Sequence, residues 1–323
     1  SMFVFENVPG LISANDGLAY KTIVDDFTHL NFRWEEVRRL LNLDGGGEIQ
    51  GYHLIFNGVV DAAKFGVPQT RKRLIIVGVR KDLARRVAPH ELAYLFRRAL
   101  MGPYKHVSKY PLTCMEAFEG RTLPDLQSEY EEIMKEYEEV WELVRSTRAE
   151  KSKLETWSKL SFDVVKDYLT LNEIALRDRN EAIEAFEEHE KLLRELGYWN
   201  VRVESLKPGD GSNVPPHEPP DIKEKVKMIP PGENFSFLVG TPWELRRKGV
   251  SQIYRRLHPL KPSYTVVAYG GGGMAMYHYK RSRSALTNRE KARLQTFPDS
   301  FAFIGNYSTV KAQIGEAVPP LLA

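Results

Sequence analysis

Cysteine is almost absent from this sequence of 323 residues, since Cys114 is the only one. A single thiol cannot close an internal disulfide, which excludes the disulfide-stapled secreted domains and favours a reducing cytoplasm. Long apolar runs are also lacking, and no stretch reaches the roughly 18 residues that indicate a membrane-spanning helix. We therefore expect a globular protein of the cytoplasm.

Charge of either sign shows little excess overall, but it is unevenly distributed. The formal net charge is +3, yet residues 243–293 hold twelve Lys and Arg against two Glu. Residues 128–195 are acidic instead. A surface like the first one suits a polyanion such as DNA. A basic run alone is more often ordinary solvated surface, so the charge does not decide the partner.

Apolar patterning predicts an α/β beginning and a helical middle. A strand is predicted at residues 3–5, ending before Pro9-Gly10, then an amphipathic helix over 23–41 and strands at 52–60 and 74–79. This order of strand, helix, strand and strand suits the end of an α/β sheet better than a complete one. Residues 126–196 are charged with apolar residues at helical spacing, which predicts a helical hairpin inserted into a second domain. A solvated insert is favoured over a coiled-coil arm that binds a partner.

Globular sequence resumes after a Pro- and Gly-rich loop at residues 206–221. Residues 265–269 are a strand candidate that runs into four glycines. Thr287 and Glu290 have the spacing of a capping box, which predicts a helix start. A last helix is expected to run into Gly315.

Five short motifs, each weak by itself, occur in an informative order. They are Glu6-Asn7-Val8, Phe65-Gly66-Val67-Pro68-Gln69-Thr70-Arg71-Lys72-Arg73, Pro262-Ser263-Tyr264-Thr265 with the glycine run, Leu286-Thr287-Asn288-Arg289-Glu290 through Phe297-Pro298-Asp299, and Gln313-Ile314-Gly315-Glu316-Ala317-Val318-Pro319-Pro320. Together they resemble the DNA cytosine-5 methyltransferases, from the family's sixth conserved motif through its tenth. The resemblance covers the chain apart from its variable middle.

The resemblance implies a pocket for a cytosine base. Glu6 matches the family's glutamate that holds N3 and the exocyclic amine, and Arg73 matches the arginine that donates to O2. Arg71 and Gln69 match the shell that supports this arginine, and we group Arg71 with the catalytic residues. In this family a cysteine thiolate attacks carbon 6 of a flipped cytosine, and carbon 5 then takes the methyl group of S-adenosylmethionine. Without the flanking motifs, Glu6 would be read as a helix or loop cap.

Contacts to DNA and cofactor are also implied by the resemblance. The residues expected at double-stranded DNA are Gln69, Arg256, Thr265, Gly271, Gly272 and Arg289. Phosphate contacts of this kind set the register of the protein on the duplex. The glycines could equally form a tight turn, and Arg289 could equally lock the fold.

The last motif implies contacts to S-adenosylmethionine from Glu316, Ala317 and Val318. Two departures from the family pattern concern this end of the chain. The family's usual Gly-Asn is Gly315-Glu316 here, and the arginine expected at position 284 is replaced by Ser284, with Arg283 adjacent. No metal site is expected.

Two parts of the family's pattern are not in the sequence, namely the glycine-rich cofactor motif and the Pro-Cys nucleophile. Cys114 follows Thr113 rather than a proline, and we interpret it as a packing cysteine. The expected fold class is thus α/β, with the last strands of a Rossmann-like methyltransferase sheet and a mixed, helix-rich target-recognition domain. We assign residues 1–80 to the catalytic domain, 81–255 to the target-recognition domain and 256–323 to a return segment that completes the catalytic domain.

Such a chain would expose an unpaired, apolar sheet edge. We therefore expect it to need a second subunit that bears the cofactor site and the cysteine, as in split methyltransferases, and to be inactive alone. A longer polypeptide cut at this point is the other explanation.

Two other classes of function stay open. A non-catalytic DNA-binding module would have kept the recognition domain and lost methyl transfer, although DNA binding alone needs no base pocket. A helical interaction scaffold built on residues 126–196 would have no affinity for DNA, so salt-dependent binding to duplex DNA would exclude it. Side chains that are plausible DNA contacts, but more often ordinary surface, are Asn213, His217, Arg246, Arg247 and Lys248.

Overall fold

The computed structural model describes residues 2–42, 51–84, 88–100, 102, 104–146, 155–244, 253–269 and 276–323. The chain divides into two compact units. The first comprises Ser1–Asp61 and Lys72–Lys105, and the second comprises Ala62–Arg71 and His106–Ala323. These units differ from the three predicted segments, because residues 256–323 pack with residues 106–255 in the second unit.

A three-stranded sheet of order β1-β3-β2 forms the centre of the first unit. The strands are β1 (Met2–Asn7), β2 (Tyr52–Asp61) and β3 (Lys72–Arg80). The predicted order of strand, helix, strand and strand is confirmed, but both pairings in this sheet are antiparallel. Residues 62–71 between β2 and β3 are too few for the crossover that a parallel pair requires.

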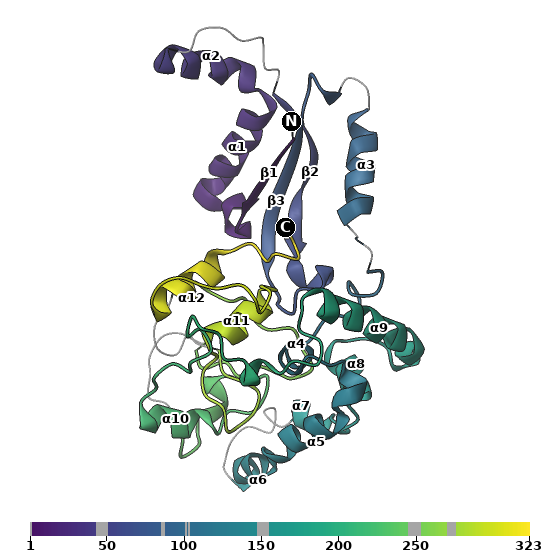
Figure 1. The fold of residues 1–323 in the computed structure, drawn as a ribbon, viewed down its shortest axis with the longest axis vertical. Helices are drawn as coiled ribbons and strands as arrows, with labels where there is room; N and C mark the ends of the chain where they lie inside the picture. Colours follow the sequence, from purple (N-terminus) through teal and green to yellow (C-terminus); the bar gives the residue numbers. More distant parts are fainter. Residues whose placement is uncertain are drawn as a thin grey trace. The chain divides into compact units, whose positions relative to one another are not determined.

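Helices flank this sheet on two sides (Figure 1). They are α1 (Leu18–Thr28), α2 (Leu30–Leu41) and α3 (Pro89–Leu100), with the short 3-10 helices η1 (Pro9–Ile12) and η2 (Ala14–Gly17) between β1 and α1. The ring of Phe3 stacks on that of Phe27 in α1, with centroids 4.2 Å apart. Gly78, opposite Phe3, leaves space for this ring, because a Cβ there would lie 2.2 Å from it. Phe56 of β2 packs on Phe96 of α3.

Helices make up most of the regular structure described in the second unit. They are α4 (Cys114–Glu119), α5 (Gln127–Lys135), α6 (Glu138–Ser146), α7 (Glu155–Ser158), α8 (Val164–Leu171), α9 (Arg179–Glu195), α10 (Pro220–Val226), α11 (Asn288–Leu294) and α12 (Tyr307–Glu316). Short 3-10 helices connect them, namely η3 (Ala62–Phe65), η5 (Leu123–Leu126), η7 (Leu176–Asp178), η8 (Val203–Ser205) and η9 (Phe235–Leu238).

The described part of the helical segment predicted at residues 126–196 contributes to the core and is not a solvated insert. Tyr130 and Tyr168 are fully buried, and Trp141 stacks on Trp157 with ring centroids 4.6 Å apart. The hydroxyl of Tyr130 donates to Asp167 at 2.9 Å, so this buried hydroxyl has a partner. The many charged residues of this segment made its buried fraction difficult to predict from the sequence.

Two local predictions near the C-terminus have opposite outcomes. The capping box at Thr287 and Glu290 is confirmed at the start of α11. The strand predicted at residues 265–269 is wrong, since these described residues form no strand. The backbone N–H of Val266 instead donates to the side chain of Gln69 at 2.7 Å, so a side chain takes the place of a neighbouring strand.

No helix within the described ranges combines the length and the apolar character needed to cross a membrane.

Candidate functional site

Glu6 and Arg73 meet across two neighbouring strands of the first unit. Glu6 is opposite Ile75 in the antiparallel register of β1 and β3. Arg73 lies two residues before Ile75, so its side chain is on the same face and diagonal to Glu6. Nε of Arg73 lies 2.8 Å from Oε1 of Glu6. The structure thus brings together the acid and the guanidinium that the resemblance assigns to one base.

The pair has capacity left for a ligand. The side chain of Glu6 is 26% exposed and that of Arg73 is 12% exposed. Nη1 of Arg73 donates to the carbonyl of Lys72, whereas Nη2 of Arg73 and Oε2 of Glu6 have no partner among the described residues. A group with both donors and acceptors, such as an edge of a pyrimidine, matches these two atoms.

Arg71 lies in the second unit and is only 2% exposed. Its Nη1 donates to the carbonyl of Val266 at 3.1 Å, and its Nη2 donates to those of Gly315 and Ala317, each at 3.0 Å. This guanidinium therefore holds backbone in place, which corresponds to the supporting part of the predicted role and not to contact with a base.

Gln69 is fully buried beside the same backbone. Its amide nitrogen donates to the carbonyl of Leu294 at 3.1 Å and to the side chain of Gln295 at 2.9 Å. Its oxygen accepts from Val266. These bonds use both ends of the amide, so the position does not favour the direct DNA contact that we expected of Gln69.

The three residues expected at the cofactor lie at the end of α12 and just after it. Glu316 is exposed, and its carboxylate accepts a hydrogen bond from the hydroxyl of Tyr269. A carboxylate can accept further bonds, so Glu316 can take a ribose hydroxyl or an amine of S-adenosylmethionine. The carbonyl of Ala317 already accepts from Arg71. Cofactor contact by these three residues stays a prediction.

Arg256 contradicts the expectation of a phosphate contact. Its side chain is 0% exposed, and it donates to the carbonyls of Val226, Ile229, His278 and Lys280. A guanidinium has five N–H donors in a fixed fork, which suits it to joining several backbone segments. In this conformation Arg256 ties residues 226–229 to 278–280 and is not available to DNA.

Arg289 takes the fold-locking role that the sequence left open. It is 1% exposed, its Nη2 forms an ion pair with Asp210 at 2.8 Å, and Nη2 also donates to the carbonyl of Phe301. Asn213 is likewise structural, because its amide donates to two carbonyls of the preceding loop. Neither side chain is placed for a phosphate.

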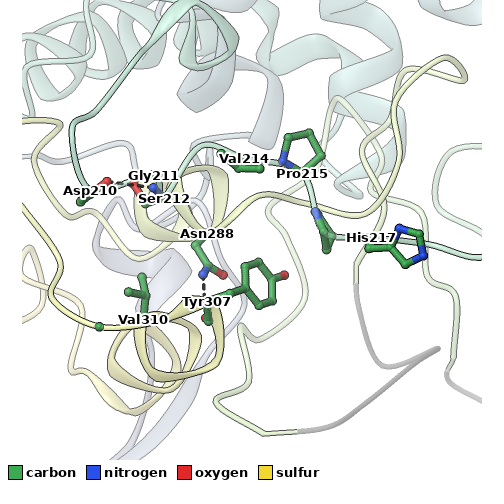
Figure 2. A pocket seen from close by; sticks show the side chains of 11 residues that line it. Asp210, Gly211, Ser212, Val214, Pro215, His217, Asn288, Tyr307 and Val310 are labelled. Atoms are coloured by element: carbon green, nitrogen blue, oxygen red, sulfur yellow. Dashed lines mark hydrogen bonds between the residues drawn. The ribbon is translucent and has the colours of Figure 1, made fainter.

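Other expected DNA contacts have different placements. The hydroxyl of Thr265 donates to the carbonyl of Thr70 at 2.8 Å. His217 is exposed and lines a cavity of about 450 Å³ whose other walls include Asn288 and Tyr307 (Figure 2). The remaining expected contacts, Gly271, Gly272, Arg246, Arg247 and Lys248, lie outside the described residues.

Cys114 is a packing residue, as its sequence context predicts. It is fully buried at the start of α4, and this burial raises the pKa of its thiol. A thiol that stays protonated in the interior is a poor nucleophile. Cys114 therefore does not supply the thiolate that methyl transfer to cytosine needs.

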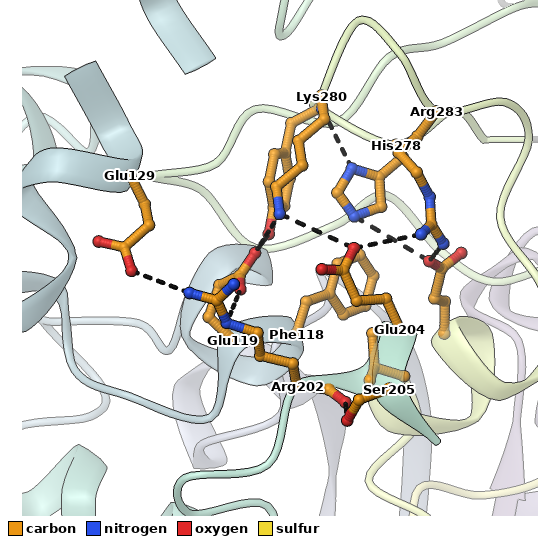
Figure 3. Close-up of polar contacts among 12 residues, drawn as sticks. Phe118, Glu119, Glu129, Arg202, Glu204, Ser205, His278, Lys280 and Arg283 are labelled. Carbon is orange, nitrogen blue, oxygen red and sulfur yellow. Dashed lines mark hydrogen bonds and ion pairs between the residues drawn. The ribbon is translucent and has the colours of Figure 1, made fainter. Parts of the chain in front are cut away.

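Sequence reasoning missed a charged cluster around the end of α4 (Figure 3). The carboxylate of Glu119 is 3% exposed, and it lies 2.9 Å from Nζ of Lys280 and 3.3 Å from Nε of Arg202. Nearby, Arg283 pairs with Glu290 of the capping box at 2.7 Å. Only the charge of the individual residues was visible in the sequence, because these partners are far apart along the chain. Among the described residues, no group of His, Cys, Asp and Glu has the arrangement of a metal site.

Residues 1–323 match the family described as C-5 cytosine-specific DNA methylase. DNA (cytosine-5-)-methyltransferase M.ApeKI of Aeropyrum pernix is 51% identical over 99% of this chain. Type II methyltransferase M.BbvI of Brevibacillus brevis is 30% identical and M.NgoFVII of Neisseria gonorrhoeae is 27% identical, each over 99% of the chain.

The shares of these relatives that the chain covers are smaller. The chain spans 69% of the length of M.ApeKI and 55% of the length of each of the other two. The match to the family nevertheless extends over every residue of the sequence. This chain belongs to the C-5 cytosine-specific DNA methylase family.

Proposed function

We propose that this chain supplies the target-base side of a DNA cytosine-5 methyltransferase, which transfers the methyl group of S-adenosylmethionine to carbon 5 of a flipped cytosine in a specific site of duplex DNA. The observation that carries the proposal is the ion pair of Glu6 and Arg73, at 2.8 Å. The resemblance assigns both residues to one base, although they are far apart in the sequence.

The chemistry of cytosine suits this pair. Its Watson–Crick edge presents an amine at carbon 4 and acceptors at N3 and O2. The carboxyl group of Glu6 takes the amine and shares a proton with N3, while Nη2 of Arg73 donates to O2. Withdrawing electrons through N3 makes carbon 6 open to attack, and this is the general-acid role of Glu6. The base reaches the pair only after leaving the duplex stack.

The thiolate must come from residues outside this sequence, since Cys114 is buried. We propose that it lies, with most of the cofactor site, on a longer form of this polypeptide or on a partner chain, and that this chain alone does not methylate DNA. The share of M.ApeKI that the chain covers, 69%, leaves room for such residues. S-adenosylmethionine supplies the methyl group when bound, and Glu316, Ala317 and Val318 hold one edge of it.

The DNA side of the proposal rests on fewer residues than the sequence indicated. Thr265 and the glycine run with Gly271 and Gly272 remain proposed contacts to the phosphate backbone. Arg256 and Arg289 act through the fold, because their guanidinium groups are bonded in the interior.

Transfer of a labelled methyl group from S-adenosylmethionine to duplex DNA tests the proposal. We expect no transfer with this chain alone and clear transfer with a preparation that also contains the family's Pro-Cys segment, either in the same polypeptide or as a second chain. In that preparation, Glu6→Gln should lower the rate by roughly 10²-fold or more, as loss of a general acid does. Methylation by this chain alone, or an unchanged rate in Glu6→Gln, would refute it.

Arg80 offers a matched control in the same strand. Its Nε lies 2.9 Å from the carboxylate of Asp82, so Arg80→Lys removes a similar guanidinium–carboxylate contact away from Glu6. Arg73→Lys should slow methyl transfer strongly, because a lysine cannot reach both the carboxylate and a base. Arg80→Lys should leave the rate within about twofold. Equal effects of the two variants would show that the loss is structural.

A further inference from the structure

We infer that Arg71 and Gln69 are positioning residues that lock the backbone of residues 265–268 to the end of α12, so that the DNA-side segment and the cofactor-side segment move as one body. The inference rests on the proposed function, which identifies residues 265–268 with DNA binding and the end of α12 with cofactor binding. The junction itself lies wholly within the second unit.

The guanidinium of Arg71 bonds both sides of the junction at once. On one side it donates to the carbonyl of Val266, next to the proposed phosphate contact Thr265. On the other side it donates to the carbonyls of Gly315 and Ala317, which enclose Glu316 in the sequence. Because Arg71 is 2% exposed, water does not readily replace these bonds, and separating the sides leaves buried carbonyls without donors.

A second connection runs through two buried amides. Gln69 accepts from the N–H of Val266 at 2.7 Å and donates to the side chain of Gln295 at 2.9 Å. Gln295 donates in turn to the carbonyl of Ile314 at 2.6 Å. Residue 266 and residue 314 are therefore joined by a chain of hydrogen bonds that does not include Arg71.

Close backbone contact completes the junction. A Cβ on Gly315 would lie 2.2 Å from the backbone nitrogen of Ala268, so only glycine permits α12 to approach this segment so closely. At the exposed edge, the hydroxyl of Tyr269 donates to Glu316. A shift of residues 265–268 on binding DNA is thus transmitted to the residues proposed to hold the cofactor.

Hydrogen exchange of this chain without ligands tests the junction directly. Arg71→Lys keeps the charge but cannot bond both sides, so the amides of Val266 and Ala317 should both exchange faster, by the same factor of roughly tenfold or more. Arg256→Lys is the matched control, since Arg256 is equally buried and also bonds only carbonyls. It should speed exchange near residues 226–229 and 276–280 and leave Val266 and Ala317 unchanged.

Faster exchange of only one of the two amides in Arg71→Lys would overturn the inference, because the two sides would then open separately. If Arg71→Lys does not fold, Tyr269→Phe replaces it. That variant removes a single bond at the exposed edge, and it should speed exchange of Tyr269 and Glu316 together by about twofold or more. Faster exchange at one of them alone would also overturn the inference.

A binding measurement tests what the junction does. With the preparation that methylates DNA, the dissociation constant for S-adenosylmethionine is measured with and without duplex DNA. DNA should change this dissociation constant by the same factor in the unaltered protein and in Arg256→Lys. In Arg71→Lys, the factor by which DNA changes the dissociation constant should be at least threefold smaller. An unchanged factor in Arg71→Lys would refute the positioning role. Failure of every preparation to methylate DNA would refute the proposed function instead, and the exchange result would still decide the junction.

Discussion

Glu6 of β1 and Arg73 of β3 form a diagonal cross-strand pair, with Nε of the guanidinium 2.8 Å from Oε1 of the carboxylate. On the same face of β1, Met2 and Val4 are 59% and 62% exposed. The other described side chains on this face of β1 are largely exposed to solvent. The ion pair is therefore the main polar contact that joins this face to the sheet. It serves the proposed base site and also fixes β1 to the sheet.

A double-mutant cycle should detect this tie. Glu6→Gln, Arg73→Met and the double variant are compared by urea unfolding of the chain. Because Glu6 is 26% exposed, solvent screens the pair, and we expect a coupling free energy of about 0.5–1 kcal/mol. A coupling of zero would show that the pair is too mobile to fix the strand.

Arg256 provides a prediction about a side chain that looked functional in the sequence. Arg256→Met leaves the carbonyls of Val226, Ile229, His278 and Lys280 without their donor, so we expect a loss of about 3–5 kcal/mol in the free energy of unfolding. Since the side chain is buried, Arg256→Lys should not alter the salt dependence of DNA binding. If log K for DNA binding depended less steeply on log salt in Arg256→Lys, the result would show that Arg256 does contact a phosphate.

The order of the motifs predicted that Glu6 and Arg73 lie close together. No pattern in the residues next to either of them could have predicted this. The two residues come from separate strands, and their diagonal placement depends on the register of β1 with β3. Strand positions and the capping box of Thr287 follow from nearby residues and were predictable. The antiparallel sheet was not, because apolar runs do not reveal which strands are neighbours.

The arginines show why the DNA side was harder to predict. Arg256 and Arg289 were expected at DNA, but a phosphate contact and a bond to a buried carbonyl require the same side chain. Charge in the sequence cannot separate the two, because burial depends on other segments, such as the one with Ser212, which lies 77 residues before Arg289. An arginine whose buried guanidinium donates to carbonyls stabilises the fold, yet in the composition it counts as part of a basic surface.

His189 should make the stability of the chain depend on pH. Its Nδ1 lies 2.9 Å from Oε1 of Glu116 and its Nε2 lies 2.9 Å from the carbonyl of Tyr110, so both nitrogens face acceptors. Burial by itself lowers the pKa of His189, but the charge and hydrogen bond of Glu116, with the carbonyl of Tyr110, raise it overall. The stabilisation is therefore fully present below the unfolded pKa of about 6.5 and is lost as the pH rises through the folded pKa.

Urea unfolding of His189→Gln and of the unaltered chain at pH 7 and pH 9 tests this direction. The advantage of the unaltered chain should be smaller at pH 9. His258→Gln is the control, because burial lowers the pKa of His258 to about 3 and this residue is neutral in both states above pH 7. A difference that grows with pH for His189→Gln would mean that the buried imidazole is neutral.

Lys291 in α11 gives the opposite dependence. It is 3% exposed, and among the described residues its amine has only the side chains of Asn288 at 3.4 Å and Tyr307 at 3.2 Å as hydrogen-bond partners. Burial, with a smaller contribution from Lys311, lowers the pKa of Lys291 to about 8. Below pH 8 the folded chain must keep this charge in its interior, and this costs stability relative to the unfolded chain, where the pKa is about 10.4.

Lys291→Met should therefore stabilise the chain at pH 7, by about 1–2 kcal/mol after the loss of the two weak hydrogen bonds. The gain should shrink as the pH rises from 8 to 10, because the lysine of the unaltered chain then loses its proton on folding. Lys64→Met, at an exposed position of η3, should change stability by less than about 0.5 kcal/mol at either pH. A gain from Lys291→Met that is the same at pH 7 and pH 10 would show that folding leaves the pKa of Lys291 at its ordinary value, and a loss at pH 7 would show that its hydrogen bonds outweigh the cost of its burial.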